Sequence, residues 1–137
     1  MGAPAAAHSM RIDSEEDIIA VRRVVREFAE ARKFDSFATA AITTAASELA
    51  RNALVHGGKG LAEVEEVTDG YRVGIRLVFS DNGPGIADLQ RALAGGNSTV
   101  RTMGLGLSGS RRLVDEFNIK TEVGCGTTVT VTKWKRY

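Results

Sequence analysis

The stretch SDNGPGI, residues 80–86, follows a largely apolar run over residues 75–79. Its carboxylate, Asp81, stands where a strand is expected to end, and Gly83 and Gly85 follow with a proline between them. Glycine permits positive φ and lets another group approach the backbone, while proline stiffens the loop. A carboxylate in this place can accept a hydrogen bond from an exocyclic amine, which adenine carries and guanine replaces with an oxygen. A simple Asx turn would use the same residue types.

A second set of residues suited to chemistry stands on a predicted helix. Glu48 and Asn52 are four residues apart in SELARN, so they share one helix face about one turn from each other. The carboxylate can accept a proton or position a nucleophile, and the amide oxygen can ligate a hard cation. Taken alone, a solvated helix surface is the commoner explanation of such a pair.

Glycines open a third stretch, GLGLSG, at residues 104–109. It matches the dinucleotide-binding pattern G-x-G-x-x-G, but that pattern requires a preceding strand and a βαβ unit, which this sequence does not predict. Glycines at a helix N-terminus still expose backbone N–H groups and the positive dipole end, which favours phosphates at Gly104 and Gly106. The Walker pattern and the protein-kinase signatures His-Arg-Asp and Asp-Phe-Gly do not occur in the sequence.

The fourth stretch is GCGTTVTV, residues 124–131, which predicts a tight hairpin. Its Thr127 and Thr128 are expected to face the same pocket as the other three stretches. β-branched strand residues after a turn are the alternative explanation.

The elements that position these residues form one predicted domain. Helical spacing of apolar residues predicts helices over 14–33 and 37–56, and Gly57 and Gly58 end the second. Strands are predicted at five places: residues 10–12, 61–67, 71–80, 118–123 and 127–134. Three further segments are expected, a short helix over 86–93, a mobile loop over 94–104 and a helix over 106–117.

This order predicts an α/β fold, a two-layer sandwich with helices packed on one face of a mixed β-sheet. The domain is expected to cover residues 10–137, after a disordered N-terminus over residues 1–9. The net charge is only +1, which argues against nucleic acid or anionic membranes as partners. One cysteine, Cys125, permits no internal disulfide, and no apolar run reaches the length of a membrane span. A cytoplasmic location is therefore expected.

In their order along the chain, the four stretches resemble the GHKL superfamily of ATPases and kinases, which contains gyrase, Hsp90, histidine kinases and MutL. The segments ITTAASELARNALVHGGKG, DNGPGI, GLGLSGSRRLVDEFNI and GTTVTVTKW are similar to those of RsbT-type serine/threonine switch kinases, and the resemblance covers residues 10–135. It implies a Bergerat fold that binds ATP with Mg²⁺. The stretch GGNSTVRTMGLGL is slightly longer and more basic than the family's pattern leads one to expect.

The resemblance also implies roles for individual residues. Asp81 would recognise adenine, Asn52 would hold Mg²⁺ against the phosphates, and Glu48 would orient or deprotonate the attacking group. Arg101, counted with Glu48 as catalytic, or Lys59 would supply a cation, while His56 would only end its helix. The implied nucleotide-binding residues are Asn52, Asp81, Gly83, Gly85, Ile86, Gly104, Leu105, Gly106, Leu107 and Thr128.

By the same resemblance, the chain would phosphorylate Ser or Thr on a STAS-domain protein of the anti-sigma-antagonist or stressosome type. The alternative is a binding switch without catalysis, in which the ATP-bound protein sequesters a sigma factor or activates a PP2C-type phosphatase. A detached ATP domain of a histidine kinase is a third hypothesis. Two features disfavour it: the N-terminus that begins with a helix, and the brief lid, the stretch GGNSTVRTMGLGL over the expected phosphate site.

Overall fold

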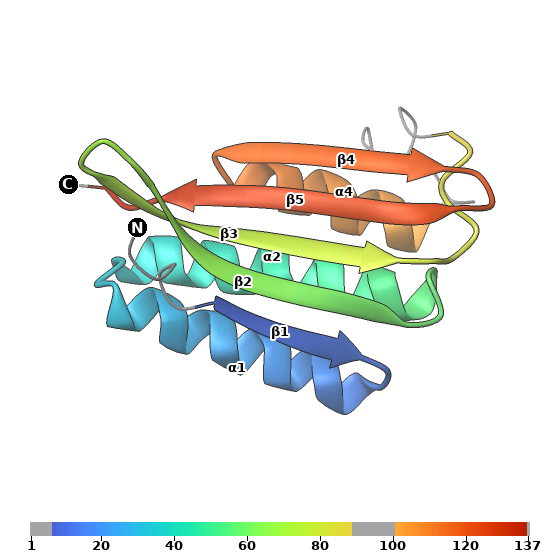
Figure 1. Cartoon of the computed structure of the whole chain (residues 1–137), viewed down its shortest axis with the longest axis horizontal. Coiled ribbons are helices and arrows are strands. Elements are labelled where there is room, and N and C mark those ends of the chain that lie inside the picture. The colour runs from blue at the N-terminus through green and yellow to red at the C-terminus, as the bar shows by residue number, and fades with distance from the viewer. Residues whose placement is uncertain (1–6, 89–100, 137) are drawn as a thin grey trace.

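The structure is a computed structural model that describes residues 7–88 and 101–136, with the backbone alone described for residues 101–106. In the described part of the chain, three helices cover one face of a five-stranded sheet, and none of them covers the other face (Figure 1). The predicted two-layer sandwich is therefore confirmed. The elements are β1 (Ala7–Ile12), α1 (Glu15–Ala31), α2 (Ser36–Val55), β2 (Gly60–Asp69), β3 (Arg72–Asp81), α4 (Arg101–Leu113), β4 (Glu116–Glu122) and β5 (Gly126–Trp134).

The sheet has the order β1-β2-β3-β5-β4, and all four neighbouring pairs in the described part of the chain are antiparallel. The prediction of a mixed sheet is therefore wrong. A helical connection after β3 is typical of a parallel pair. Here α4 connects β3 to β4, but β5 lies between these two strands in the sheet. The two strands joined by the helix are therefore not neighbours, and no parallel pair forms.

Two predicted boundaries differ from the structure at the ends of the sheet and of the third helix. Strand β1 begins at Ala7 and pairs with β2, so residues 7–9 are ordered parts of the sheet edge. Glu116 and Phe117 were expected to be helical but begin β4, where Phe117 pairs with Val131. The spacing of apolar residues in this segment is compatible with a helix and with a strand, and pairing with β5 favours the strand.

The third helix also begins earlier than predicted. Helix α4 starts at Arg101, so residues 101–104, expected in a mobile loop, have helical backbone. Residues 86–88 were expected to begin a short helix and are not helical. The remainder of that expected helix and of the expected loop lies outside the described residues. None of the described helices is both long and apolar enough to cross a membrane.

Helix α2 lies at the centre of the helix layer, because it packs against α1, α4 and the sheet. Its N-terminus is capped by Asp35, whose carboxylate accepts a hydrogen bond of 2.7 Å from the backbone N of Ala38. Small buried side chains let it approach its neighbours closely. These side chains are Ala38, Ala45, Ala46, Ala50 and Ala53. The packing carries the last turn of α2 to the end of β3 that bears Asp81.

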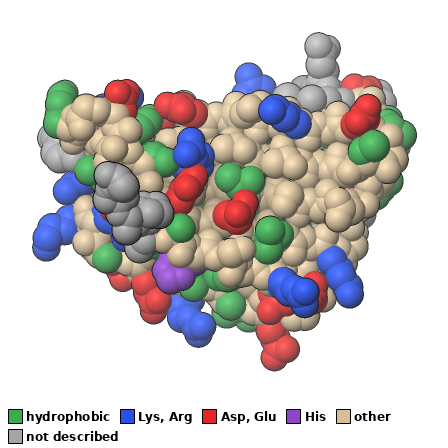
Figure 2. Space-filling view, viewed as in Figure 1, with side chains coloured by type: hydrophobic (Ala, Val, Ile, Leu, Met, Phe, Trp, Pro, Cys, Tyr) green, Lys and Arg blue, Asp and Glu red, His purple; other side chains and the backbone are tan. Residues whose placement is uncertain are grey.

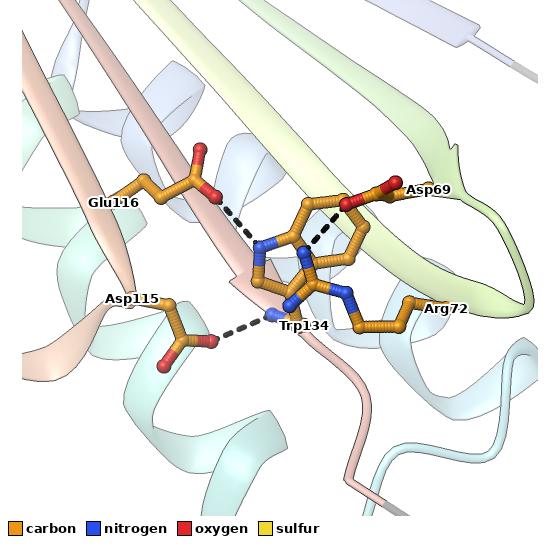
Figure 3. A network of polar contacts seen from close by, with 5 residues as sticks. All are labelled: Asp69, Arg72, Asp115, Glu116 and Trp134. Carbon is orange, nitrogen blue, oxygen red and sulfur yellow. Dashed lines mark hydrogen bonds and ion pairs between the residues drawn. The ribbon is translucent and has the colours of Figure 1, made fainter.

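A polar network fastens the other end of the sheet (Figure 3). The Arg72 guanidinium stacks over the Trp134 ring at 4.1 Å and pairs with Asp69 at 2.8 Å. Trp134 donates from its indole Nε1 to Glu116 and from its backbone N to Asp115, at 2.8 and 2.7 Å. The end of β5 is thus tied to the β2–β3 turn and to the start of β4, which gives the sheet a fixed frame.

The β4–β5 hairpin contains two glycines with positive φ, Gly124 at 84° and Gly126 at 105°. A side chain on Gly124 would meet nothing within 4 Å. A Cβ on Gly126 would overlap the carbonyl oxygen of Asp81 and lie 2.9 Å from the Cα of Asn82. A side chain at Gly124 would therefore cause backbone strain alone, whereas one at Gly126 would cause the same strain and also a clash with the end of β3.

We predict that Gly126→Ala destabilises the fold far more than Gly124→Ala. The left-handed conformation should cost Gly124→Ala about 1–2 kcal/mol. The overlap with β3 should raise the cost for Gly126→Ala to about 3 kcal/mol or more. Urea unfolding followed by tryptophan fluorescence measures both values, and equal losses would show that the hairpin does not pack against Asp81 as described.

Candidate nucleotide-binding site

An enclosed pocket lies between helix α2 and the end of the sheet that carries Asp81. Its walls are mostly apolar, with a few polar side chains, which is the usual composition of a small-molecule site. It encloses about 30 Å³, room for about one water molecule, so a purine enters only if the walls move apart. The lining residues are Leu49, Asn52, Ala53, His56, Phe79, Asp81, Gly85, Ile86, Leu107, Thr127 and Val129.

Asp81 is the acid of this pocket. Its Oδ1 accepts a hydrogen bond of 2.9 Å from the backbone N of Gly83, and the backbone N–H of Thr127 also donates to the carboxylate. Burial raises the pKa of Asp81 above its ordinary value, although these two hydrogen bonds and nearby His56 act in the opposite direction. The two N–H groups therefore hold the carboxylate in a fixed orientation, and its burial costs free energy when it is ionised. Its oxygens can still accept further hydrogen bonds.

Close backbone packing explains the glycines around Asp81. A Cβ on Gly57 would collide with the Asp81 side chain, and one on Gly83 would lie 2.6 Å from the Cα of Gly57. Gly85 has a φ of 79°, and a Cβ there would overlap the carbonyl oxygen of Glu122. Gly85 thus uses the positive φ that glycine permits, whereas at Gly83 the contact with the end of α2 requires glycine.

The loop after Asp81 is tied to the β4–β5 hairpin. The backbone N of Ile86 donates to Thr121 Oγ1 at 2.9 Å, and the backbone N of Gly124 donates to the carbonyl of Pro84 at 2.8 Å. Thr121 Oγ1 also shares a hydrogen bond of 2.8 Å with Thr127 Oγ1. Thr121 therefore connects the loop to the pocket wall, although no motif in the sequence marks it.

The last turns of α2 present two polar side chains to the pocket, Asn52 and His56. The Nδ2 atom of Asn52 and the Nε2 atom of His56 are buried and have no hydrogen-bond partner in the described part of the chain. Burial lowers the pKa of His56, an effect that the Asp81 charge partly offsets, so the imidazole is neutral at physiological pH. Buried polar atoms are nearly always paired, so these two atoms favour a ligand that pairs with them.

Glu48 lies on the same helix as Asn52, one turn before it, and is half-buried. It does not line the enclosed pocket. Among the described residues, no group of three His, Cys, Asp or Glu side chains could hold a metal ion.

The structure brings five of the predicted nucleotide-binding residues into the pocket lining: Asn52, Asp81, Gly85, Ile86 and Leu107. Thr128 does not line this enclosed pocket, although Thr127 and Thr128 together line a shallower hollow beside Asp81. Successive strand residues point to opposite faces of the sheet. Thr127 and Val129 are two residues apart, so both point toward the pocket. Thr128 lies between them and points to the open face, beside its strand partners Ser80 and Lys120. This parity was present in the sequence and could have identified Thr127.

The predicted phosphate-binding segment lies inside helix α4 instead of opening it. The first four backbone N–H groups of a helix have no partner within it, and in α4 these belong to residues 101–104. Gly104 is therefore the last residue with a free N–H group, and Gly106 lies beyond this first turn. The side chains of Arg101 and Leu105 lie outside the described part of the structure. Lys59 is exposed and lines a separate hollow beside Asp81 with Arg11.

Comparison with known proteins decides the family. The pattern of the histidine kinase-like ATPase domain matches residues 13–133. The chain belongs to this family. Serine/threonine-protein kinase RsbT of Bacillus subtilis is 41% identical over 127 residues, which are 93% of this chain and 96% of that protein. The predicted relationship to the RsbT-type kinases is therefore confirmed, and membership of this ATPase family implies use of ATP.

Other relatives are more distant. An anti-sigma F factor of Thermoanaerobacter is 29% identical over 99 residues, 68% of each chain. The structure of the RsbU and RsbW domains of a Mycobacterium tuberculosis protein has a TM-score of 0.69 at 24% identity, covering 98% of this chain and 34% of that one. The SiaB–SiaC complex of Pseudomonas aeruginosa gives a TM-score of 0.53 at 11% identity, covering 94% of this chain and 89% of that one. These two structures confirm the GHKL-type fold.

We predict that Asp81→Asn leaves the unliganded protein as stable as the wild type, or more stable, at pH 7, while ATP binding weakens about tenfold or more. Because burial raises the pKa of Asp81 above its ordinary value, the contribution of Asp81 to stability is fully present below the pKa of the unfolded chain and is lost as pH rises through the folded pKa. The amide keeps the acceptor for the N–H groups of Gly83 and Thr127 but removes the buried charge.

Thermal melting at pH 7 and pH 3.5 and calorimetric titration with ATP measure both effects. Glu63→Gln, which neutralises an exposed carboxylate on β2, is the control and should change neither property. A variant Asp81→Asn that melts at a lower temperature yet binds ATP normally would assign Asp81 a purely structural role.

Proposed function

We propose that this protein is an ATP-dependent kinase that transfers the γ-phosphoryl group to a Ser or Thr hydroxyl of a STAS-domain antagonist protein in a partner-switching module. The observation that carries the proposal is a half-buried carboxylate acceptor, Asp81, in an apolar pocket of a chain whose relative over 93% of its length is a serine/threonine-protein kinase. We place this activity in the cytoplasm, where ATP and such partners occur.

Recognition of the base follows from the pocket chemistry. Leu49, Phe79 and Val129 supply apolar surface for a flat ring, and Asp81 accepts from the amine of adenine. Guanine carries an oxygen at that place, which the carboxylate would repel. A neutral His56 beside Asp81 leaves the acceptor charge uncompensated and available.

Asn52 is the residue proposed to hold Mg²⁺. Magnesium prefers oxygen ligands and usually keeps waters and substrate phosphates in its shell, so one protein amide oxygen is sufficient. The Nδ2 atom of Asn52 is buried without a partner among the described residues, which supports a bound group that accepts a hydrogen bond from it while the amide oxygen faces the metal. The backbone N–H groups at the start of α4 and the positive end of its dipole favour phosphates there. Arg101 and Lys59 are the proposed sources of a cation.

Glu48 is the proposed general base. Phosphoryl transfer depends mainly on positioning and on neutralisation of charge, and a carboxylate near the nucleophile can take its proton late in the transfer. Glu48 stands one turn from Asn52 and outside the enclosed pocket, where a hydroxyl of a partner protein can reach it.

The similarity to an anti-sigma F factor over 68% of each chain favours a second function. In it, the ATP-bound protein binds a sigma factor or activates a PP2C-type phosphatase. Mixing the purified protein with a STAS-domain protein and γ-labelled ATP separates the two. Transfer of label to the STAS protein supports the kinase, whereas stable complex formation without transfer supports the binding switch.

We predict that Glu48→Gln lowers the rate of phosphoryl transfer about 10²- to 10⁴-fold because it removes the base and keeps the size of the side chain. The ATP dissociation constant should stay unchanged, since Glu48 does not line the pocket. Glu27→Gln on the exposed side of α1 is the matched control. Transfer by Glu48→Gln at the wild-type rate would assign catalysis to positioning alone.

We predict that Asn52→Ala abolishes the dependence of ATP binding on Mg²⁺. The wild type should bind ATP more tightly with Mg²⁺ than with EDTA, because Asn52 contributes a ligand, and the variant should bind equally in both. Asn118→Ala, at an exposed position of β4, is the control and should behave as the wild type. If Asn52→Ala retains the full effect of Mg²⁺, the metal ligand lies elsewhere.

A further inference from the structure

A second concave surface lies between α1 and α2, on the solvent side of the helix layer. It has a volume of about 460 Å³. Arg22, Arg26 and Glu30, at successive turns, form its α1 wall, and α2 supplies Ala40, Thr43 and Thr44 to the opposite wall. The two helices lie side by side on the same face of the sheet (Figure 1). The open face of the sheet, seen in Figure 2, is on the other side of the molecule.

Among the residues that line this surface, two arginines, Arg22 and Arg26, outnumber one acid, Glu30, so its net charge is positive. Arg22 and Arg26 are exposed, and neither takes part in an ion pair within the described part of the chain. By contrast, Arg32 is paired with Glu66 and Arg51 with Glu15, at 2.7 and 3.1 Å. Like charges four residues apart on a helix repel each other, so Arg22 and Arg26 disfavour one another. Glu30, four residues after Arg26, offsets part of this repulsion at Arg26 and leaves Arg22 without an acidic neighbour among the groove residues.

The opposite wall and the floor leave space for a bound segment. The small side chains of α2 keep the groove open, and buried Phe34 gives it an apolar end. Thr43 is buried in the floor, and its Oγ1 has no hydrogen-bond partner among the described residues. Phe37, next to the groove residue Ser36, is 88% exposed. An aromatic side chain beside arginines is a composition enriched at protein–protein interfaces.

We propose that this groove docks an acidic segment of a protein partner. The carboxylates of the segment would relieve the repulsion between Arg22 and Arg26, and its apolar side chains would cover the exposed Phe37. The groove lies on the far side of α2 from the nucleotide pocket, and Thr43 is about 13 Å from Asn52 along the helix axis. A partner can therefore bind here without covering the nucleotide. Only the identity of the partner, a STAS-domain substrate, rests on the proposed function.

The test compares two doubly charge-reversed variants. Arg22→Glu with Arg26→Glu reverses the groove, and Arg23→Glu with Arg111→Glu makes the same change in net charge at exposed positions outside it. The probe is a short fluorescein-labelled, helix-forming peptide of Glu, Ala and Leu, with a Lys-for-Glu peptide as its counterpart. Fluorescence anisotropy should show tighter binding of the acidic peptide to the wild type, weakening as salt rises.

The groove variant should lose about tenfold or more of this affinity, and the control pair about twofold or less. Absence of binding to the wild type, equal binding of the two peptides or equal losses in both variants would overturn the proposal. In a kinase assay, the groove variant should raise KM for a STAS-domain substrate and leave kcat and the ATP dissociation constant unchanged. If no STAS protein is phosphorylated by the wild type, the proposed function fails, while the peptide titration still decides the groove.

Discussion

The carboxylate of Asp81 lies where the end of α2, the end of β3, the following loop and the start of β5 meet. Two backbone N–H groups fix it, and the surrounding backbone is so close that side chains at Gly57, Gly83 and Gly126 would collide with neighbouring atoms. The geometry of all these segments therefore depends on a small acid held in one position. Hydrogen bonds from the loop to the β4–β5 hairpin and the network around Trp134 at the other end keep the sheet in the register that this position requires.

The same position is unfavourable for stability alone. Burial raises the pKa of Asp81, so the ionised form costs free energy in the folded protein at neutral pH. The neighbouring nitrogen atoms of Asn52 and His56 are buried without partners in the described part of the chain. Three unfavourable polar groups around one apolar pocket are typical of a binding site, where local rules for stability are broken for function. The amine of a nucleotide would pair with the Asp81 carboxylate, and oxygen atoms of the nucleotide would accept from the Asn52 nitrogen.

The sequence predicted the local features of this site and not the contacts between distant segments. The end of β3 at Asp81 and the shared helix face of Glu48 and Asn52 follow from periodicity, and the family resemblance gave their roles. His56 was missed because its place in the pocket depends on the approach of α2 to β3, which no local pattern records. The mixed sheet was predicted wrongly for the same reason, since strand order is a property of the whole fold. Thr128 was chosen over Thr127 although strand parity distinguishes them.

Recognition of the adenine amine by Asp81 is the central claim, and removal of that amine tests it most directly. Calorimetric titration of the wild type with ATP and with purine riboside triphosphate, both with Mg²⁺, compares two ligands that differ only in the amine. Loss of one hydrogen bond to a charged acceptor should weaken binding about tenfold or more. Equal affinity for the two nucleotides would contradict the assignment of Asp81 and with it the account of the pocket.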